Sequence, residues 1–467
     1  MRGPDNCGVV SWQDGDKWQI TVYEADFRTP ETFKGKVFYQ IFPDRFCEGV
    51  ENKPMPFPDR LYQADKHAEP FWQPNETGGH LNEDYFGGDL KGIQLKLPYL
   101  HEMGVDYLYL NPIFEAHSNH RYNTADYLNV DPLLGTNEDF ETLCKEAAKY
   151  GIGIVLDGVF SHTGSDSRYF NREGGVIDTW LRRGAAGFRL DVADELPDAF
   201  IEKIRAAVKR VSPEKFLLGE VWEDATTKYG FGHRRTYLLG KGLDSVMNYP
   251  FKNAVLDFVK GKPAQQAMNE ILSICEHYPA PALNTALNFL STHDTERALT
   301  VIADEPANGR GREWQSGRNM SGEAYEEGML RLRMAYAIIY TLPGLPCLYY
   351  GDEIGMQGYR DPFNRGYYCW DSHEERLKPV LAQLAQLRHS CEAFRTGALR
   401  VLRAEGGVLH YQRVGATETA EIIVNRSEHI IVEPLASGKH TEVNPMGFTI
   451  VVEENGHNPN HSYYDIQ

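Results

Sequence analysis

Two features that a secreted or membrane-bound protein would show are missing from this sequence. Its start, MRGPDNCGVV, lacks the apolar segment of a signal peptide. No run of about 18 apolar residues follows that could cross a membrane. We therefore expect a cytoplasmic protein without a membrane partner, with secretion left open if a leader has been trimmed.

Cysteine is scarce and widely spaced. The seven cysteines lie at positions 7, 47, 144, 275, 347, 369 and 391, and no C-x-x-C pair occurs. An odd number at this spacing disfavours both a zinc site and a disulfide framework, and it favours reduced thiols. We expect neither a bound metal nor a cofactor.

Positive charge is in deficit. The chain has 48 Lys and Arg against 66 Asp and Glu, which gives a net charge of −18. Such a surface repels phosphate backbones, so we expect no nucleic-acid partner. A neutral polymer is not repelled. The 26 tyrosines and 7 tryptophans fit either sugar-stacking platforms or ordinary packing, and composition alone does not separate the two.

The chain is long enough for a large domain and a smaller one, with 467 residues of which 42% are hydrophobic. Short apolar runs rich in β-branched and aromatic residues alternate with stretches of helical period. The runs cover residues 37–42, 105–114, 152–160, 187–192, 216–222, 244–249, 286–294 and 346–353. Strands separated by crossover helices run parallel, so these units predict an α/β protein with a closed (β/α)8 TIM barrel over residues 36–395. An open doubly wound sheet would need a Gly-rich phosphate turn, which the sequence lacks.

Helical stretches separate these runs. They cover residues 89–104, 137–151, 176–185, 197–212, about 254–276, 327–342 and, after the last strand, 376–389. From about Ala398 the sequence alternates with period two and no helix intervenes, which predicts a small antiparallel β-sandwich over residues 396–467. Residues 1–35 form a lead in which 18–27 alternate like a strand, and we interpret it as the remnant of a β module.

Charged residues end several of the predicted strands. They are Asp157 and His162 on the third, Arg189 and Asp191 on the fourth, Glu220 on the fifth, His293 and Asp294 on the seventh, and Asp352 and Glu353 on the eighth. A charge inside an apolar run is costly unless it is paired or functional. Because barrel active sites lie at the C-terminal ends of the strands, these residues predict a polar site there.

Three carboxylates and an arginine without a Cys/His cluster fit glycoside hydrolysis better than metal catalysis. This chemistry needs one carboxylate that attacks the anomeric carbon and one carboxylic acid that protonates the leaving oxygen. Arg189 precedes Asp191 by two residues, on the same face of the strand, and should lower the pKa of Asp191 and keep it ionised. Apolar neighbours such as Trp222 should favour the protonated form of Glu220. Asp294 can hold substrate hydroxyls.

Four segments resemble the signature segments of the α-amylase family of glycoside hydrolases. They are DGVFSH (157–162), GFRLDVADE (187–195), GEVWEDA (219–225) and FLSTHD (289–294), in family order on the third, fourth, fifth and seventh strands. Four further segments look most like the neopullulanase and cyclomaltodextrinase branch. They are YQIFPDRF (39–46), SNHRYNTADY (118–127), GLPCLYYGDEIGM (344–356) and DPFNR (361–365). The resemblance covers about residues 18–395.

This resemblance implies a retaining enzyme that cleaves α-1,4-glucosidic bonds, and in some members α-1,6 bonds, of malto-oligosaccharides, cyclodextrins, pullulan or starch. It assigns Asp191 as the nucleophile, Glu220 as the general acid/base and Asp294 as the stabiliser of the transition state. The expected partner is an α-glucan, and a homodimer is left open.

The resemblance also implies residues that bind the sugar. His162, Arg189 and His293 match residues that hold the glucose at the point of cleavage, and Tyr122 matches a tyrosine stacked under that sugar. Asp157 matches a buried structural carboxylate at the floor of the site. We interpret Trp222 as a contact on the leaving-group side, with an ordinary core tryptophan as the alternative.

The chain departs from the family pattern in two places. Ser161 stands where the family usually has an asparagine that helps to bind calcium, so we expect no calcium there. Between the third and fourth strands, where relatives carry a sizeable excursion domain, residues 171–175 run almost directly into the helix at 176–185. Either the chain lacks one wall of the cleft, or the sequence joins two separated segments.

Two alternatives to a hydrolase remain open. A transglycosylase would use the same chemistry and resolve the intermediate with a sugar hydroxyl instead of water. A non-catalytic relative would use the barrel for binding. Such relatives lose catalytic carboxylates, and all three are present here.

Overall fold

The structure is a computed structural model of the chain. It describes residues 18–51, 53, 60–74, 82–163 and 175–455, together with the backbone of a last strand at 461–464.

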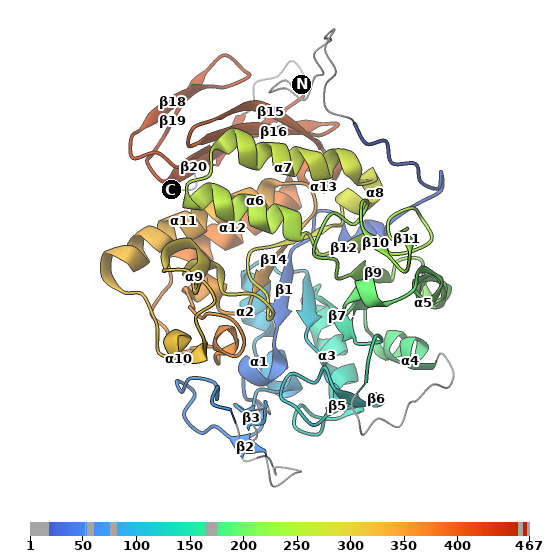
Figure 1. The fold of residues 1–467 in the computed structure, drawn as a ribbon. Helices are drawn as coiled ribbons and strands as arrows, with labels where there is room; N and C mark the ends of the chain where they lie inside the picture. Colours follow the sequence, from blue (N-terminus) through green and yellow to red (C-terminus); the bar gives the residue numbers. More distant parts are fainter. Residues whose placement is uncertain are drawn as a thin grey trace.

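Within the described residues, eight parallel strands form the barrel. They are β1 (Phe38–Ile41), β4 (Tyr107–Leu110), β7 (Gly153–Gly158), β8 (Gly187–Leu190), β9 (Phe216–Gly219), β12 (Ser245–Val246), β13 (Leu287–Phe289) and β14 (Leu345–Tyr349). Their order is β12-β9-β8-β7-β4-β1-β14-β13, and a parallel bridge from Met247 to Leu287 joins the two ends. The predicted (β/α)8 barrel is confirmed (Figure 1).

Helices surround the barrel. The longer ones are α3 (Asn137–Lys149), α4 (Gly175–Arg183), α5 (Asp198–Val211), α6 (Tyr249–Lys260), α7 (Ala264–His277), α11 (Gly322–Thr341) and α12 (Leu377–Ser390). The short ones are α1 (Leu90–Leu95), α2 (Leu97–Glu102), α8 (Ala280–Leu283), α9 (Ala298–Ala303), α10 (Arg312–Gln315) and α13 (Ala393–Thr396).

Two predicted helices are each divided in two. The stretch at 89–104 breaks at Lys96, and Pro98 lies in the first turn of α2, where a missing N–H costs nothing. The stretch at 254–276 breaks at Gly261, whose φ of +136° suits glycine. Pro263 then precedes α7.

Alternating side chains of the strands fill the barrel with an apolar core. Phe38, Val155 and Leu218 belong to one buried cluster inside it. Two residues further along each strand the same inward direction is taken by Gln40, Asp157 and Glu220. The apolar interior therefore ends in a layer of polar groups at the C-terminal ends of the strands.

The C-terminal part is an antiparallel sheet, as predicted. Its strands are β15 (Ala398–Glu405), β16 (Val408–Val414), β17 (Glu418–Asn425), β20 (Gly447–Glu454) and β21 (His461–Tyr464). A hairpin of β18 (Ile431–Pro434) and β19 (His440–Val443) covers one face through Ile423, Leu435, Val443 and Val451. The other face packs on α7 and α11, so the sandwich has unequal layers (Figure 1).

Three small pairs of strands lie in the loops that follow barrel strands. They are β2 (Leu61–Tyr62) with β3 (Asp84–Tyr85), β5 (Phe114–Ala116) with β6 (Thr124–Val130), and β10 (Tyr229–Gly230) with β11 (His233–Arg234).

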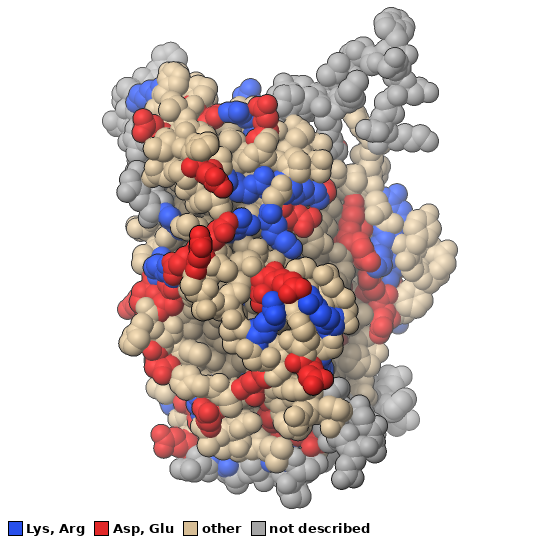
Figure 2. Space-filling model, turned by 60° about the vertical axis from the view of Figure 1, so that its left-hand side comes forward, with Lys and Arg blue, Asp and Glu red and all other residues tan. Residues whose placement is uncertain are grey.

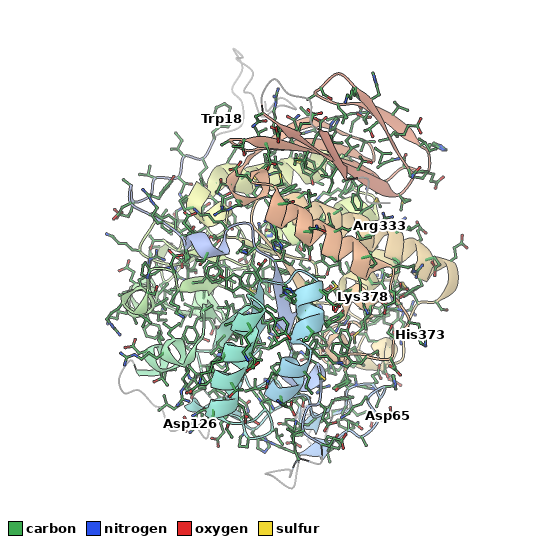
Figure 3. All side chains as sticks on the ribbon, turned by 180° about the vertical axis from the view of Figure 1, so that it is seen from behind. Trp18, Asp65, Asp126, Arg333, His373 and Lys378 are labelled. Carbon is green, nitrogen blue, oxygen red and sulfur yellow. The ribbon has the colours of Figure 1, made fainter. Side chains whose placement is uncertain are left out.

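Residues 18–27, which alternate like a strand in the sequence, pair with no strand of the described chain. Gln19 Nε2 donates to Thr226 Oγ1 at 2.7 Å, and Thr21 Oγ1 donates to the carbonyl of His277 at 2.7 Å. Trp18 and Ile20, by contrast, are exposed, and Figure 3 shows Trp18 at the edge of the molecule. The alternation thus reflects one side attached to the barrel and one side facing solvent.

Among the described residues, none of the helices has the length and apolar character needed to cross a membrane. On the face drawn in Figure 2, Lys and Arg lie beside Asp and Glu rather than in a separate basic patch. The predicted shortening between the third and fourth strands falls on residues 164–174, outside the described residues.

Candidate active site

Four of the predicted site residues lie on, or directly after, the three neighbouring strands β7, β8 and β9. Asp157 on β7 lies opposite Arg189 on β8 in the parallel register. Leu190 on β8 lies opposite Gly219 on β9, so Asp191 and Glu220 are the next residues on two neighbouring strands. The barrel register thus brings these side chains to one rim, as the sequence predicts.

Arg189 is the centre of this group. Its Nη1 donates to Asp157 Oδ1 at 2.8 Å and to Asp191 Oδ1 at 2.9 Å. Its Nη2 lies 2.9 Å from Glu220 Oε2 as an ion pair outside hydrogen-bond geometry. The Arg189 side chain is fully buried. One buried cation therefore faces three carboxylates.

Glu220 is held on its other side by groups from the loop and from α6. The indole N–H of Trp222 donates to Glu220 Oε1 at 3.0 Å, and Tyr249 Oη lies 3.4 Å from the same oxygen. The Trp222 and Tyr249 rings stack with centroids 4.4 Å apart. Trp222 is 47% exposed, so it is not a core residue, and it contacts Glu220 through its N–H rather than through an apolar surface.

Val192 holds Glu220 from the main chain in an uncommon conformation. Its backbone N–H donates to Glu220 Oε2 at 2.8 Å, and its φ is +39°. A β-branched residue rarely adopts this left-handed region, and such strain collects at functional sites. The turn directly after Asp191 is therefore shaped to reach Glu220.

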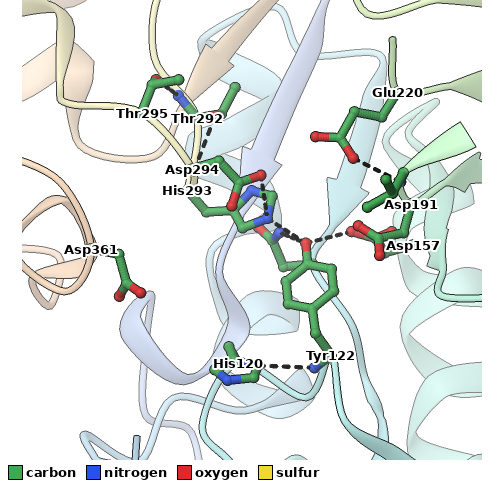
Figure 4. A network of polar contacts seen from close by, with 12 residues as sticks. His120, Tyr122, Asp157, Asp191, Glu220, Thr292, His293, Asp294, Thr295 and Asp361 are labelled. Atoms are coloured by element: carbon green, nitrogen blue, oxygen red, sulfur yellow. Dashed lines mark hydrogen bonds and ion pairs between the residues drawn. The ribbon is translucent and has the colours of Figure 1, made fainter. Parts of the chain in front are cut away.

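Asp294 belongs to a second group around Tyr122 and His293. Asp294 Oδ2 lies 3.1 Å from His293 Nε2. The Tyr122 hydroxyl donates to Asp157 Oδ2 at 2.8 Å and also contacts His293 Nε2. Figure 4 shows the Tyr122 hydroxyl between Asp157 and His293, so Tyr122 connects the two groups of carboxylates.

The amide of Gln40 determines which nitrogen of His293 carries a proton. Gln40 Nε2 lies 2.9 Å from His293 Nδ1 and donates to Asn111 Oδ1 at 3.0 Å. Because an amide nitrogen only donates, Nδ1 of His293 accepts and Nε2 carries the hydrogen. Burial, together with the charges of Arg365 and Arg189, lowers the pKa of His293 well below its ordinary value. His293 is thus a neutral donor at Nε2.

Burial also shifts the carboxyls. It raises the pKa of Asp191 from 3.8 to about 6, with Arg189 acting against the shift and Glu220 adding to it. It raises the pKa of Asp294 to about 6, and Glu220 adds to that shift as well. The expectation that Arg189 keeps the pKa of Asp191 low is therefore wrong in its net effect. Arg189 lowers it, but loss of water around the carboxyl outweighs one shared cation.

Arg365 and Asp361 were not singled out by the sequence reasoning, although they lie in the DPFNR segment. Arg365 Nη2 lies 3.8 Å from Asp294 Oδ1, and its Nη1 lies 3.0 Å from Asp361 Oδ1. Arg365 Nε donates to the carbonyl of His293 at 3.0 Å. Figure 4 shows Asp361 apart from the other carboxylates, across the site from Asp191.

Other strand-end residues lie outside this cluster. His162 is exposed, and its Nδ1 lies 2.9 Å from Ser161 Oγ. Asp352 contacts Arg297 and Tyr336, and Glu353 accepts hydrogen bonds from Tyr39, Tyr99 and Tyr368. Asp352 and Glu353 thus belong to a buried network behind β14. In the described part of the chain, no group of three or more His, Cys, Asp or Glu side chains is placed to hold a metal ion.

The fold and the site together define a class: a (β/α)8 barrel with a buried cluster of carboxylates around one arginine at the C-terminal ends of its strands. The sequence profile of the alpha-amylase catalytic domain matches residues 40–175 and 173–397. The chain belongs to the alpha-amylase family. The two matched segments meet at 173–175, the place where the sequence predicts a shortened excursion.

Individual relatives agree with this assignment. Neopullulanase 2 of Thermoactinomyces vulgaris is 32% identical over 88% of this chain and 74% of its own length. The amylopullulanase of Thermoanaerobacter thermohydrosulfuricus is 31% identical over 87% of this chain, which spans only 33% of that protein. A solved structure, the cyclic alpha-maltosyl-(1→6)-maltose hydrolase of Arthrobacter globiformis, superposes with a TM-score of 0.76 at 27% identity, covering 91% of this chain and 100% of that one.

Proposed function

We propose that this chain is a retaining glycoside hydrolase that cleaves α-1,4-glucosidic bonds, and α-1,6 bonds where they occur, in malto-oligosaccharides, cyclodextrins, pullulan or starch. The names of its relatives support this substrate class, because they refer to pullulan and to a cyclic maltosyl-maltose. We assign Asp191 as the nucleophile, Glu220 as the general acid/base and Asp294 as the third carboxylate.

One observation carries this proposal: Asp191 and Glu220 contact the same guanidinium, that of Arg189. Two carboxyl groups on adjacent strands can act on the two sides of one glycosidic bond. Asp191 attacks the anomeric carbon while Glu220 transfers its proton to the leaving oxygen, and a glycosyl–enzyme ester forms. Water then gives a proton to Glu220 and attacks the ester, which restores both groups.

The neighbours suit the sugar that would sit between these groups. Asp294 is the most accessible of the three carboxylates, with 31% of its side chain exposed, so it can accept hydrogen bonds from sugar hydroxyls. The neutral His293 donates from Nε2 beside it. Tyr122 offers a ring fixed at its hydroxyl by Asp157, which supports its role as a stacking surface.

An assay for new reducing ends tests the proposal with maltoheptaose and γ-cyclodextrin as substrates. We expect turnover by the natural chain and a loss of several orders of magnitude in Asp191→Asn, with the fold intact by circular dichroism. Chains longer than the substrate would indicate the transglycosylase instead. No turnover of either sugar by the natural chain, or an Asp191→Asn rate within tenfold of it, would contradict the proposal.

Retention of the α configuration is a separate prediction. A carboxylate that attacks directly stands at roughly 5–5.5 Å from the acid, whereas inverting enzymes leave room for water at roughly 6.5–9.5 Å. Asp191 and Glu220 follow adjacent strands, which are spaced by about 4.8 Å. Proton NMR of the first-formed product should show the α-anomer. The β-anomer would overturn the mechanism and leave the substrate class standing.

A further inference from the structure

Four side chains beside the catalytic carboxylates form a closed ring of polar contacts: Gln40, Asn111, Tyr122 and His293. Gln40 Nε2 donates to Asn111 Oδ1 at 3.0 Å and lies 2.9 Å from His293 Nδ1. Asn111 Nδ2 donates to the Tyr122 hydroxyl at 2.9 Å, and that hydroxyl contacts His293 Nε2. The ring thus joins β1, the ends of β4 and β13, and the loop before β6, which are far apart in the sequence.

Water has little access to this ring. Gln40, Asn111 and His293 are each 1% exposed. The Tyr122 ring lies parallel to the imidazole of His293, with centroids 5.2 Å apart. The backbone N–H of Asn111 donates to the carbonyl of Ile41 at 3.0 Å and so continues the pairing of β4 with β1. Because buried polar groups depend on each other for hydrogen bonds, each donor in the ring has to face an acceptor.

Asp157 fixes the direction of the hydrogen bonds around the ring. Its Oδ2 accepts from the hydroxyls of Tyr122 at 2.8 Å and Tyr109 at 2.7 Å, and its Oδ1 accepts from Arg189 Nη1 at 2.8 Å. Burial raises the pKa of Asp157 to about 6, with Arg189 acting against the shift and Asp191 adding to it. The carboxyl is therefore ionised at pH 7.5, and an ionised carboxylate accepts hydrogen bonds but donates none.

The orientation of both amides follows from the carboxylate. Because Tyr122 gives its only proton to Asp157, its oxygen has to accept from the ring. Asn111 therefore turns Nδ2 toward Tyr122 and Oδ1 toward Gln40, and Gln40 has to turn Nε2 toward Asn111. The second hydrogen of that Nε2 is donated to His293 Nδ1, which leaves the imidazole proton on Nε2. Reversing one amide would bring two donors or two acceptors face to face.

This direction reaches the catalytic carboxylates at His293 Nε2. That nitrogen lies 3.1 Å from Asp294 Oδ2 and also contacts the Tyr122 hydroxyl (Figure 4). Because Asn111 already donates to the Tyr122 oxygen, that oxygen competes less strongly for the His293 proton. The proton is then available to Asp294 and to a sugar hydroxyl beside it. The opposite tautomer would place a lone pair of the imidazole against the Asp294 carboxylate.

We propose that Asn111 and Gln40 are positioning residues that keep the proton of His293 on Nε2, facing the bound sugar. This inference rests on the proposed function and deepens it, because it adds two residues that act through His293 and Tyr122 rather than on the sugar. Their loss should lower the rate and change its pH dependence.

Asn111→Asp tests the direction of the ring, because the new carboxyl keeps the shape of the amide but only accepts when it is ionised. Two carboxylates then compete for the Tyr122 proton, and kcat/KM on maltoheptaose should fall about 30-fold at pH 7.5 relative to the natural chain. When protonated, the new carboxyl again donates to Tyr122 and accepts from Gln40, so the loss should shrink to about threefold at pH 5. Asn111→Leu has no polar atoms and should lose about 30-fold at both pH values.

Asn288→Asp is the matched control. Asn288 is also fully buried, accepts from Asn248 Nδ2 at 2.9 Å and donates to the carbonyl of Pro343 at 2.7 Å, and both partners lie outside the ring. This variant should keep the pH dependence of the natural rate. Equal recovery at pH 5 in Asn288→Asp and Asn111→Asp would overturn the proposal, and so would an Asn111→Asp loss that is the same at both pH values.

NMR of protein labelled with 15N-histidine reports the tautomer of His293 without any turnover, and His293→Gln identifies the signal by its loss. The natural chain should carry the proton on Nε2. In Gln40→Glu the new carboxylate cannot donate, so Nδ1 should become protonated. A proton on Nδ1 in the natural chain, or an unchanged tautomer in Gln40→Glu, would show that the ring does not act as proposed. If the natural chain cleaves no α-glucan, the hydrolase falls, and this measurement still decides the ring.

Discussion

Asp191 occupies a position that costs the folded chain stability. Burial raises its pKa from 3.8 to about 6, so the folded state binds the proton more tightly than the unfolded state. The resulting penalty is absent below pH 3.8, grows as the pH rises, and is complete above about pH 6. A shift of this size corresponds to at most about 3 kcal/mol, less where neighbouring carboxyls share it.

We therefore predict that Asp191→Asn raises the free energy of unfolding at pH 7.5 by about 1–3 kcal/mol while it abolishes turnover. The gain should shrink at pH 5, where the natural carboxyl is largely protonated in the folded chain. Urea unfolding at the two pH values measures it. Asp257→Asn, on the exposed surface of α6, serves as the control. An equal gain at both pH values would show that burial of the charge is not the cause.

The same shift sets the acidic limb of the pH–rate profile. A nucleophile must be ionised, and burial places the pKa of Asp191 at about 6, so kcat/KM should fall as the pH drops below about 6. Glu220→Gln should remove most of the rate, because the group that protonates the leaving oxygen is lost. Initial rates between pH 4 and pH 8 measure the acidic limb. An acidic limb near pH 4, or a Glu220→Gln rate within tenfold of the natural chain, would contradict the assignments.

At this scale, the sequence predicts contacts between residues that lie close together in the chain. Asp191 and Arg189 are two residues apart, so their contact follows from the strand alone. Arg365 and Gln40 reach His293 from distant loops and strands, and only the closed barrel brings them there. The pKa of Asp191 depends on how deeply its carboxyl is buried, and the local sequence around Arg189 and Asp191 does not reveal that depth.

At the scale of the element, the sequence predicts where strands begin better than where they end. The fourth run was expected over 187–192 and the strand covers Gly187–Leu190, because Asp191 already turns toward the site. The runs at 216–222 and 286–294 end early for the same reason. The hairpin of β10 and β11 has two residues in each strand, too few for a periodic pattern to show.

That hairpin leads into Arg235, which anchors the segment after β8. Arg235 Nε donates to Asp198 Oδ1 at 2.8 Å, Nη1 donates to the carbonyl of Asp194 at 2.9 Å, and Nη2 donates to the carbonyl of Leu196 at 2.5 Å. Its guanidinium lies 4.4 Å from the centroid of the Tyr237 ring. Arg235 is 2% exposed, so water cannot easily replace its guanidinium as the hydrogen-bond donor to these partners.

We predict that Arg235→Ala lowers the free energy of unfolding by about 2–4 kcal/mol, because two carbonyls and a carboxylate lose a buried partner. Arg235→Lys should recover less than half, since an ammonium cannot reach three acceptors in one plane. Urea denaturation provides the measurement. The adjacent Arg234, which is exposed, is the control, and Arg234→Ala should cost less than about 1 kcal/mol. Equal losses at the two positions would show that the anchoring contacts are not responsible.

At the scale of the whole molecule, the barrel and the C-terminal sheet share one core. Leu409, Ile422 and Ile450 of the sheet belong to the same buried cluster as Leu332 and Ala335 of α11. The change of pattern near Ala398 predicts a change of architecture, and the sheet confirms it. The sequence pattern does not show that the barrel and the sheet share a core. Period-two alternation indicates which side of a strand is buried, but it does not indicate which element packs against that side.

Arg413 joins the two parts. It is fully buried, Nε and Nη2 donate to the carbonyl of Gly397 at 3.1 and 2.9 Å, and Nη1 donates to the carbonyl of Thr341 at 2.9 Å. Thr341 is the last residue of α11, and its hydroxyl lies 2.6 Å from Tyr411 Oη. Burial lowers the pKa of Arg413 to about 10, so the side chain is still charged at neutral pH.

We predict that Arg413→Ala lowers the free energy of unfolding by about 3–5 kcal/mol, because it leaves two carbonyls without a donor and a cavity at the joint. Arg400 on β15 is exposed, and Arg400→Ala is the matched control, expected within about 1 kcal/mol of the natural chain. Because the core is shared, calorimetry should show one unfolding transition in both proteins, at a lower temperature in Arg413→Ala. Two transitions, with only one of them moved by the substitution, would mean that the barrel and the sheet unfold independently and that Arg413 stabilises only its own part.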